Sequence, residues 1–389
     1  MQAILTSRVL HWLPGVTLTL VFLLQSVYAA EDQWQGVERI VAIGDIHGDY
    51  DHFKEVLTGA GLINRRGNWT AGNTHFVQVG DLSDRGPDTD KIIQHMQKLE
   101  RQAPRDGGMV HALIGNHEAM NVLGDLRYVH PGEYEALRSR RARRLRDDMY
   151  SRHIEQVSAS NPEFVADDAY HDRFNTIYPL GFVEHRIAWS PEGEFGAWVA
   201  GHNTVVKINR TLFMHAGISP AVLGMTITDI NDQIRADLNG ESGEVGGLSQ
   251  TEEGPLWYRG LARGAEAPVE GHLEAVLEFY DVDRLVLGHT PGLGTVVPRF
   301  DGRVLVIDTG ISDYYGAHVA SLLIEGDDAF TVQADLQLAI PKNLDETISY
   351  FKTVAEFKSN LPALEQYINY LESPAEQTLP DTAVPDPAL

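Results

Sequence analysis

The chain of 389 residues contains no cysteine, which excludes disulfide bonds and thiolate metal sites together. Positive charge is also scarce, since 31 Lys and Arg stand against 55 Asp and Glu, a formal net charge of −24. Duplex nucleic acids are bound largely through basic groups that displace counterions, so this balance argues against a nucleic-acid partner. Abundant carboxylates remain compatible with bound divalent cations, whose charge reverses the local potential inside a cleft.

Long apolar runs are missing as well. The run at residues 16–24 falls short of the roughly 20 apolar residues that a membrane-spanning helix needs. With Arg8 before it and Ala29 and Ala30 after it, this run predicts a secretory signal peptide over residues 1–30. An uncleaved membrane anchor is the alternative. Cleavage would yield an exported protein, periplasmic or secreted, with no stable membrane span.

Short apolar segments that end abruptly in Gly, Asp or His predict buried strands at residues 39–43, 75–79, 109–114, 211–214 and 284–287. Helical spacing of apolar residues lies between the first two segments and again between the next two. This β-α-β-α-β order predicts right-handed crossovers, which bring the ends of successive strands to one edge of a sheet. Polar residues at those ends are therefore expected to converge.

The remaining sequence predicts the boundaries of one large domain over residues 31–340. Residues about 122–199 are expected to form a helical insert, which includes an arginine run over residues 138–146. That run is interpreted as a solvated helix face, with a docking surface for acidic substrates as the alternative. The helical spacing of Ile348, Phe351 and Ala355 predicts a closing helix within residues 341–372, and a proline-rich, disordered tail is expected over 373–389.

Three segments with charged or polar side chains directly follow predicted strands: GDIHGD at 44–49, GDLSDRG at 80–86 and GNHE at 115–118. HAG at 215–217 and GHT at 288–290 follow two more strands. Burying carboxylate and imidazole groups is costly unless a metal or another partner compensates. One such histidine is commonly structural, but five such strand ends together indicate a metal centre. Without thiolates, the available donors suit manganese, iron or zinc, and a pair of ions about 4 Å apart would need a bridging carboxylate.

These motifs, in this order, resemble the signature GDxHG, GDxxDRG and GNHE of the phosphoprotein-phosphatase branch of the calcineurin-like metallophosphoesterases. The resemblance extends over most of residues 40–310. GDLRY at 124–128 and PLWYR at 255–259 are most similar to the Shewanella-like protein phosphatases. The SAPNYC loop of the eukaryotic protein phosphatases is absent, and DTGISDYYG at 308–316 stands in the corresponding region. The resemblance implies an α/β fold, a metallophosphatase-type sandwich of mixed sheets flanked by helices, with a helical insert.

The resemblance also implies roles for individual residues. The metal ligands would be Asp45, His47, Asp81, Asn116, His215 and His289, with Asp81 bridging two divalent or trivalent ions. His117, oriented by Asp84, would protonate the leaving oxygen. The phosphate would be bound by Arg85, Arg259 and Asn116. Arg259 has an alternative interpretation as a surface residue beside Trp257. GHN at 201–203 imitates the GHT motif but is rejected, because it precedes the HAG strand.

The implied activity is hydrolysis of phosphate monoesters by in-line attack of a metal-bound hydroxide. The expected substrate is a phosphorylated protein, on Ser/Thr or Tyr, or a small phosphomonoester. Two alternatives stay open: a symmetrical dinucleotide tetraphosphatase, and a metal-binding scaffold without activity. The retention of His117, Asp84 and Arg85 argues against the scaffold.

Overall fold

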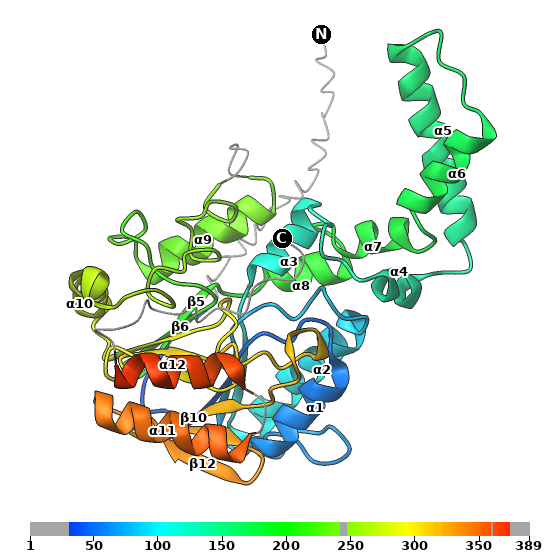
Figure 1. Cartoon of the computed structure of the whole chain (residues 1–389). Helices are drawn as coiled ribbons and strands as arrows, with labels where there is room; N and C mark the ends of the chain where they lie inside the picture. The colour runs from blue at the N-terminus through cyan, green and yellow to red at the C-terminus, as the bar shows by residue number, and fades with distance from the viewer. Residues whose placement is uncertain (1–30, 242–246, 359–360, 374–389) are drawn as a thin grey trace, which may run out of the picture.

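The fold is described from a computed structural model over residues 31–241, 247–358 and 361–373. The predicted signal peptide and the predicted tail from residue 374 onward lie outside the described residues. Two mixed six-stranded sheets are packed face to face, with helices on their outer faces (Figure 1). This arrangement confirms the predicted α/β sandwich.

The first sheet contains the three parallel strands that carry the GDIHGD, GDLSDRG and GNHE motifs at their ends. Its strand order is β12 (Leu336–Ala339), β11 (Asp328–Gln333), β10 (Ser321–Glu325), β2 (Arg39–Ile43), β3 (His75–Gln78) and β4 (Met109–Ala112). The crossovers between the parallel strands contain α1 (Tyr50–Gly59) and α2 (Thr89–Gln102). The predicted β-α-β-α-β order is therefore present, although β3 and β4 end one and two residues earlier than predicted.

The second sheet holds the HAG and GHT motifs at the ends of parallel strands. Its strand order is β1 (Gln33–Trp34), β5 (Val205–Ile208), β6 (Thr211–Met214), β7 (Arg284–Leu287), β9 (Val304–Val306) and β8 (Val297–Arg299). Strands β6 and β7 match the predicted segments residue for residue. Four helices cover the outer face: α9 (Ile227–Leu238), α10 (Glu270–Tyr280), α11 (Leu344–Phe357) and α12 (Pro362–Glu372).

Apolar side chains from both sheets form the core between them. Ile40 and Val77 of the first sheet belong to one buried cluster with Phe213 and Val286 of the second. Burial of this kind stabilises a domain by about 25 cal/mol per Å² of apolar surface. Because the two sheets pack through a shared core, the carboxyl ends of β2, β3, β6 and β7 are held at a common edge of the sandwich.

The expected helical insert corresponds to α4 (Pro131–Leu137), α5 (Ala142–Ser160), α6 (Asp168–Ile177), α7 (Phe182–Ala188) and α8 (Glu194–Ala200). Helices α5 and α6 form an arm that projects from the sandwich (Figure 1). Among the described residues, no helix combines the length and the apolar character that a membrane span requires.

The single closing helix expected over residues 341–372 is a pair of helices instead. Helix α11 ends at Phe357, and α12 begins at Pro362. Proline has no backbone N–H and clashes with the preceding turn inside a helix, but it fits the first helical position. Pro362 therefore starts a second helix, and Tyr350, Phe351, Leu364 and Tyr367 pack the pair onto the second sheet.

Candidate metal centre

The loops after β2, β3, β6 and β7 and the start of α3 (Asn116–Leu123) place six buried polar side chains together. They are the six residues predicted as metal ligands, each at most 4% exposed: Asp45, His47, Asp81, Asn116, His215 and His289. The strands from which they come belong to both sheets. Close contact between the sheets is thus a precondition for the cluster.

Asp81 lies between two halves of this cluster. Asp45 and His47 form the first half, and Asn116, His215 and His289 form the second. Its Oδ2 is 3.8 Å from His47 Nε2, whereas its Oδ1 is 3.4 Å from His215 Nε2. One carboxylate oxygen therefore faces each half. This is the geometry that a carboxylate bridging two cations requires.

The second half contains several lone pairs that face one another. His215 Nδ1 lies 2.9 Å from the carbonyl oxygen of Val79, so it carries the proton that it donates there. In the neutral ring, Nε2 then bears a lone pair, yet it lies 2.8 Å from Asn116 Oδ1 and 3.1 Å from His289 Nδ1. Converging acceptors of this kind fit a bound cation, and the hydrogen bond to Val79 orients the ring for it.

The first half contains Asp45 and His47. His47 Nδ1 lies 3.2 Å from the carbonyl oxygen of Ser83 and therefore donates to it, which turns Nε2 toward the carboxylates. Nε2 is 3.9 Å from Asp45 Oδ2. Burial, together with the positive charge of His117, lowers the pKa of His47 to about 3. A neutral imidazole is the form that binds a metal.

Excess negative charge in the cluster also fits bound cations. Burial and the charges of Asp308 and Asp81 raise the pKa of Asp45 well above its ordinary value. Burial likewise raises the pKa of Asp308 to about 7. Asp308 is 1% exposed, and its Oδ2 has no hydrogen-bond partner within the described residues. Carboxylates buried this close together require a compensating positive charge, which two metal ions would supply.

Backbone strain is concentrated in the same loops. Of eleven non-glycine residues with positive φ among those described, five belong to the site: His47, Asp81, Asp84, Arg85 and His289. Such conformations cost free energy and persist only where the surroundings enforce them. Strained backbone positions therefore coincide with residues of the site.

Glu118 is a site residue to which the sequence analysis gave no role. It is 2% exposed, and its carboxylate accepts hydrogen bonds from the backbone N–H groups of Asp81, Leu82, Ser83 and Gly115 at 2.8–3.1 Å. Glu118 therefore fixes the loop that carries Asp81 to the start of α3. Its place in the GNHE motif is the signal that the sequence carries, but the motif does not show that the carboxylate accepts hydrogen bonds from backbone groups.

His117 and Asp84 form a buried pair beside the first half of the cluster. His117 Nδ1 lies 2.6 Å from Asp84 Oδ2, and Asp84 Oδ1 accepts a hydrogen bond from Asn121 at 2.9 Å. Burial lowers the pKa of His117, but the charges of Asp81 and Asp84 outweigh it and the net shift is upward. His117 Nε2 lies 3.8 Å from Asp81 Oδ2, so by distance alone His117 also groups with His47 and Asp81 as a metal donor.

Arg85 lies between two tyrosine rings at the edge of the site. Its guanidinium carbon is 3.8 Å from the ring centre of Tyr128 and 5.0 Å from that of Tyr314. The ring of Tyr128 also contacts that of His117, with centroids 5.1 Å apart. Tyr128 thus contacts both the imidazole predicted to donate a proton and the guanidinium predicted to bind phosphate.

Arg259 points toward the cluster, in contrast to the alternative interpretation as a surface residue. Its Nη1 donates hydrogen bonds to the His289 carbonyl oxygen and to Thr290 Oγ1. Burial lowers the pKa of Arg259, and the charges of Asp308, Asp45 and Asp81 act in the opposite direction. The GHN segment lies elsewhere, since His202 Nε2 is paired with Glu100 at 2.7 Å.

A model of the calcineurin-like phosphoesterase family matches residues 38–293, which span all five motifs. The chain belongs to this family. Two Shewanella-like protein phosphatases are similar to it over about three quarters of its length. The Arabidopsis thaliana protein phosphatase 2 is 28% identical over 72% of this chain and 73% of its own length. The Plasmodium berghei protein phosphatase 1 is 27% identical over 72% and 68%.

Among solved structures, the family member is similar to the cold-active protein tyrosine phosphatase of a psychrophilic Shewanella species. The two chains superpose with a TM-score of 0.60 and 28% identity, covering 80% of this chain and 82% of that one. These comparisons confirm the predicted resemblance and establish the phosphoesterase as a metallophosphatase hydrolase.

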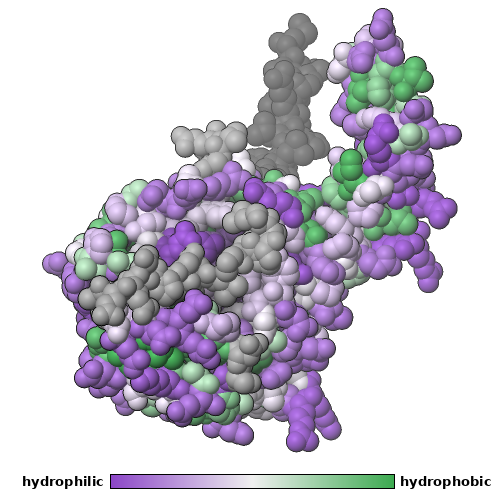
Figure 2. Space-filling model, viewed as in Figure 1, coloured by the Kyte–Doolittle hydropathy of each residue, from purple (hydrophilic) through white to green (hydrophobic). Residues whose placement is uncertain are grey.

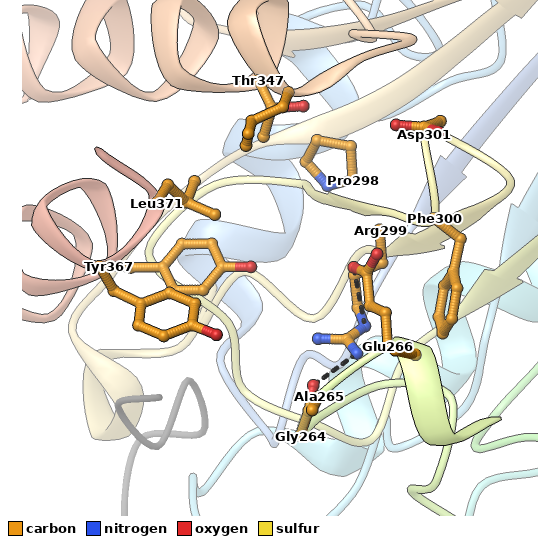
Figure 3. Close-up of a pocket in the computed structure, with 13 residues that line it drawn as sticks. Gly264, Ala265, Glu266, Pro298, Arg299, Phe300, Asp301, Thr347, Tyr367 and Leu371 are labelled. Atoms are coloured by element: carbon orange, nitrogen blue, oxygen red, sulfur yellow. Dashed lines mark hydrogen bonds and ion pairs between the residues drawn. The ribbon is translucent and has the colours of Figure 1, made fainter. Parts of the chain in front are cut away.

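A separate cavity of about 370 Å³ lies between β8 and the C-terminal helices (Figure 3). Arg299, one of its charged lining residues, is 2% exposed. The Arg299 guanidinium donates to the carbonyl oxygens of Leu261 and Gly264 at 3.0 and 2.8 Å and lies 4.0 Å from Glu266. These partners give Arg299 a structural role, and none of the motifs borders this cavity.

Proposed function

We propose that this phosphoesterase hydrolyses phosphate monoesters at a two-metal centre and that its substrates are phosphorylated proteins. The observation that carries the proposal is the placement of Asp81, with one carboxylate oxygen toward each half of the ligand cluster. Ions bound there would lower the pKa of a water nucleophile and neutralise the charge that develops on the phosphoryl group.

The chain's own residues supply the remaining parts of the reaction. Arg85 and Arg259 lie on two sides of the cluster, and a planar guanidinium can donate to two phosphate oxygens at once. A monoester dianion offers three terminal oxygens to such donors, whereas a diester offers two. The pair of arginines therefore favours a terminal monoester.

His117 is assigned as the proton donor rather than as a seventh ligand. Burial lowers the pKa values of His47 and His289, as suits neutral ligands, while the pKa of His117 is raised. A histidine with a raised pKa holds its proton to a higher pH than an ordinary imidazole, as suits a group that protonates the leaving oxygen. Asp84 holds Nδ1, which leaves Nε2 to face the reacting group.

A cleft beside the centre suits a substrate larger than phosphate. It has a volume of about 410 Å³ and is lined in part by Met120, Leu123 and Trp257. The Trp257 ring lies 5.9 Å from the ring of His289, so the cleft borders the metal centre. The names of the Shewanella-like relatives and of the tyrosine phosphatase also favour a protein substrate.

The decisive experiment is an assay of the purified protein loaded in turn with manganese, iron and zinc. Substrates would be an aryl phosphate, peptides phosphorylated on Ser, Thr or Tyr, and a dinucleotide tetraphosphate. We expect turnover of the monoesters with two metals bound per chain. Absence of turnover with every metal, or a preference for the dinucleotide, would refute the proposal.

We also propose that the enzyme is exported. Support comes from the sequence of residues 1–30 alone, with Arg8, the apolar run at 16–24 and the two alanines that follow.

A further inference from the structure

The arginine run of the insert concentrates positive charge on a chain that is otherwise strongly acidic. Residues 138–146 contain six arginines and no Asp or Glu, against a net charge of −24 for the whole sequence. Arg140, Arg141 and Arg143 are all exposed. Hydrophilic residues cover much of the visible surface of the arm that this run begins (Figure 2).

Neighbouring carboxylates neutralise only part of this run. Arg138 pairs with Glu135 at 3.1 Å, and Arg144 lies 3.8 Å from Asp148. Glu184 of α7 is close by, where it accepts hydrogen bonds from Ser139. Within the described part of the chain, no ion pair is found for Arg140, Arg141 or Arg143. Ion pairs thus involve two of the six arginines, while Arg140, Arg141 and Arg143 are exposed and keep their charge unpaired within the described residues.

The position of the run opposes helix stability. Arg141 is the N-cap residue of α5, Arg143 and Arg144 lie in its first turn, and that turn contains no acidic residue. The N-terminus of a helix carries partial positive charge, so cations there are unfavourable, and arginine is a poor N-cap. Ala142 is the one buried residue of α5, so the arginine stems do not cover an apolar face of that helix. These arginines disfavour the start of the helix and bury no apolar surface in return. Residues of this kind are expected where they serve a function.

One short helix, α4, connects the run to the loop that carries Arg85. Helix α4 begins where Gly132 packs directly against Pro87, two residues after Arg85. Seven residues of α4 span roughly 10 Å at about 1.5 Å per residue and lead directly to Arg138. An extended peptide advances about 3.3 Å per residue, so substrate residues roughly four to eight positions from the phosphorylated one can reach the run.

We propose that Arg140, Arg141 and Arg143 form a docking surface for an acidic segment of the phosphoprotein substrate. This inference rests on the proposed function and deepens it, because it names acidic sequence near the phosphorylated residue as a feature that the enzyme selects. The surface is remote from the reacting atoms. It contributes to affinity and leaves the chemical step unchanged.

The test compares the affinities of two fluorescent peptides, measured by anisotropy, in which a phosphonate analogue that cannot be hydrolysed replaces phosphotyrosine. One carries glutamates at positions four to eight on both sides of the analogue, and the other carries glutamines there. We expect the glutamate peptide to bind wild type about five- to twentyfold more tightly at low salt, the combined effect of three exposed ion pairs, and the difference to vanish at about 0.5 M salt.

The variant Arg140→Gln, Arg141→Gln, Arg143→Gln should bind both peptides equally, with unchanged turnover of an aryl phosphate and no fall in melting temperature. Its matched control is Arg65→Gln, Arg66→Gln, Arg105→Gln, which removes the same charge from exposed positions elsewhere and should keep the difference in affinity between the two peptides.

Equal affinities of the two peptides for wild type would overturn the proposal, as would a difference in affinity that survives in the first variant or disappears in the control. Tight binding of inorganic polyphosphate without a preference for the glutamate peptide would overturn it in favour of a general polyanion site. Aryl phosphate turnover tests the proposed function separately, since the binding assay does not require activity.

Discussion

The Nδ1 atom of His117 lies 2.6 Å from Oδ2 of Asp84, and both side chains are buried beside the ligand cluster. This contact fixes the tautomer and the orientation of the imidazole and leaves Nε2 3.8 Å from Asp81 Oδ2, as the proposed role of proton donor requires. The proposed role of His117 in proton transfer can be separated from metal binding by experiment.

His117→Asn should retain both metals while turnover of an alkyl phosphate falls by roughly 10²- to 10⁴-fold, the usual range for a positioned acid. Turnover of aryl phosphates with acidic leaving groups should fall less, because such a leaving group departs without a proton. Elemental analysis and a series of leaving groups check this. A collapse of metal content would instead identify His117 as a ligand.

Asp81→Asn should remove metal and activity together, because the Asp81 carboxylate has one oxygen toward each group of donors. The measurement is metal content after gel filtration, with turnover in parallel. Asp301→Asn, a matched change at an exposed aspartate, is the control. Two retained metals with full turnover would contradict the bridging role.

The raised pKa of His117 predicts a pH dependence of stability in the metal-free protein. A folded-state pKa above the unfolded value contributes stability that is fully present below the unfolded pKa, about 6.5, and is lost as the pH rises through the folded pKa. The difference in unfolding free energy between wild type and His117→Asn should therefore shrink as the pH rises. Urea titrations at several pH values measure it. Asp84→Asn should lower the pKa of His117, which NMR titration measures. An unchanged pKa would exclude Asp84 as a cause of the raised pKa of His117.

The ends of the parallel strands explain how much of this centre could be predicted from the sequence. Asp45, Asp81 and Asn116 follow strands of one crossover series, so their convergence follows from chain order alone. His215 and His289 follow strands of the other sheet, so the shared pattern of polar strand ends predicts a metal centre, but the role of each histidine as a ligand comes from the family resemblance. Glu118 was missed because most of its partners are backbone N–H groups, which no residue type in the sequence identifies. The division of residues 341–372 into two helices could have been predicted from Pro362.

Export can be tested directly. Protein from a native host should begin near Ala30 or Glu31 by mass spectrometry and should be recovered outside the cytosolic fraction. Intact Met1 in the cytosol would contradict the signal-peptide prediction.

The last prediction concerns the two arginines that face the cluster. Arg85→Lys and Arg259→Lys keep the charge but lose the planar fork that matches two phosphate oxygens, so both should lower kcat/KM for an aryl monoester. Loss of a charge-assisted hydrogen bond of about 1.5–3 kcal/mol corresponds to roughly 10- to 150-fold.

Arg85→Lys should also lose its packing between Tyr128 and Tyr314, and Arg259→Lys should lose its donation to the His289 carbonyl oxygen. A bis-aryl diester, which presents fewer terminal oxygens, should be affected less by either change. Metal content of each variant serves as the control, because Arg259 also offsets the buried charges of Asp45 and Asp308. If Arg259→Lys leaves monoester hydrolysis and metal content untouched, Arg259 does not bind the phosphoryl group, and Arg85 alone accounts for the preference for monoesters.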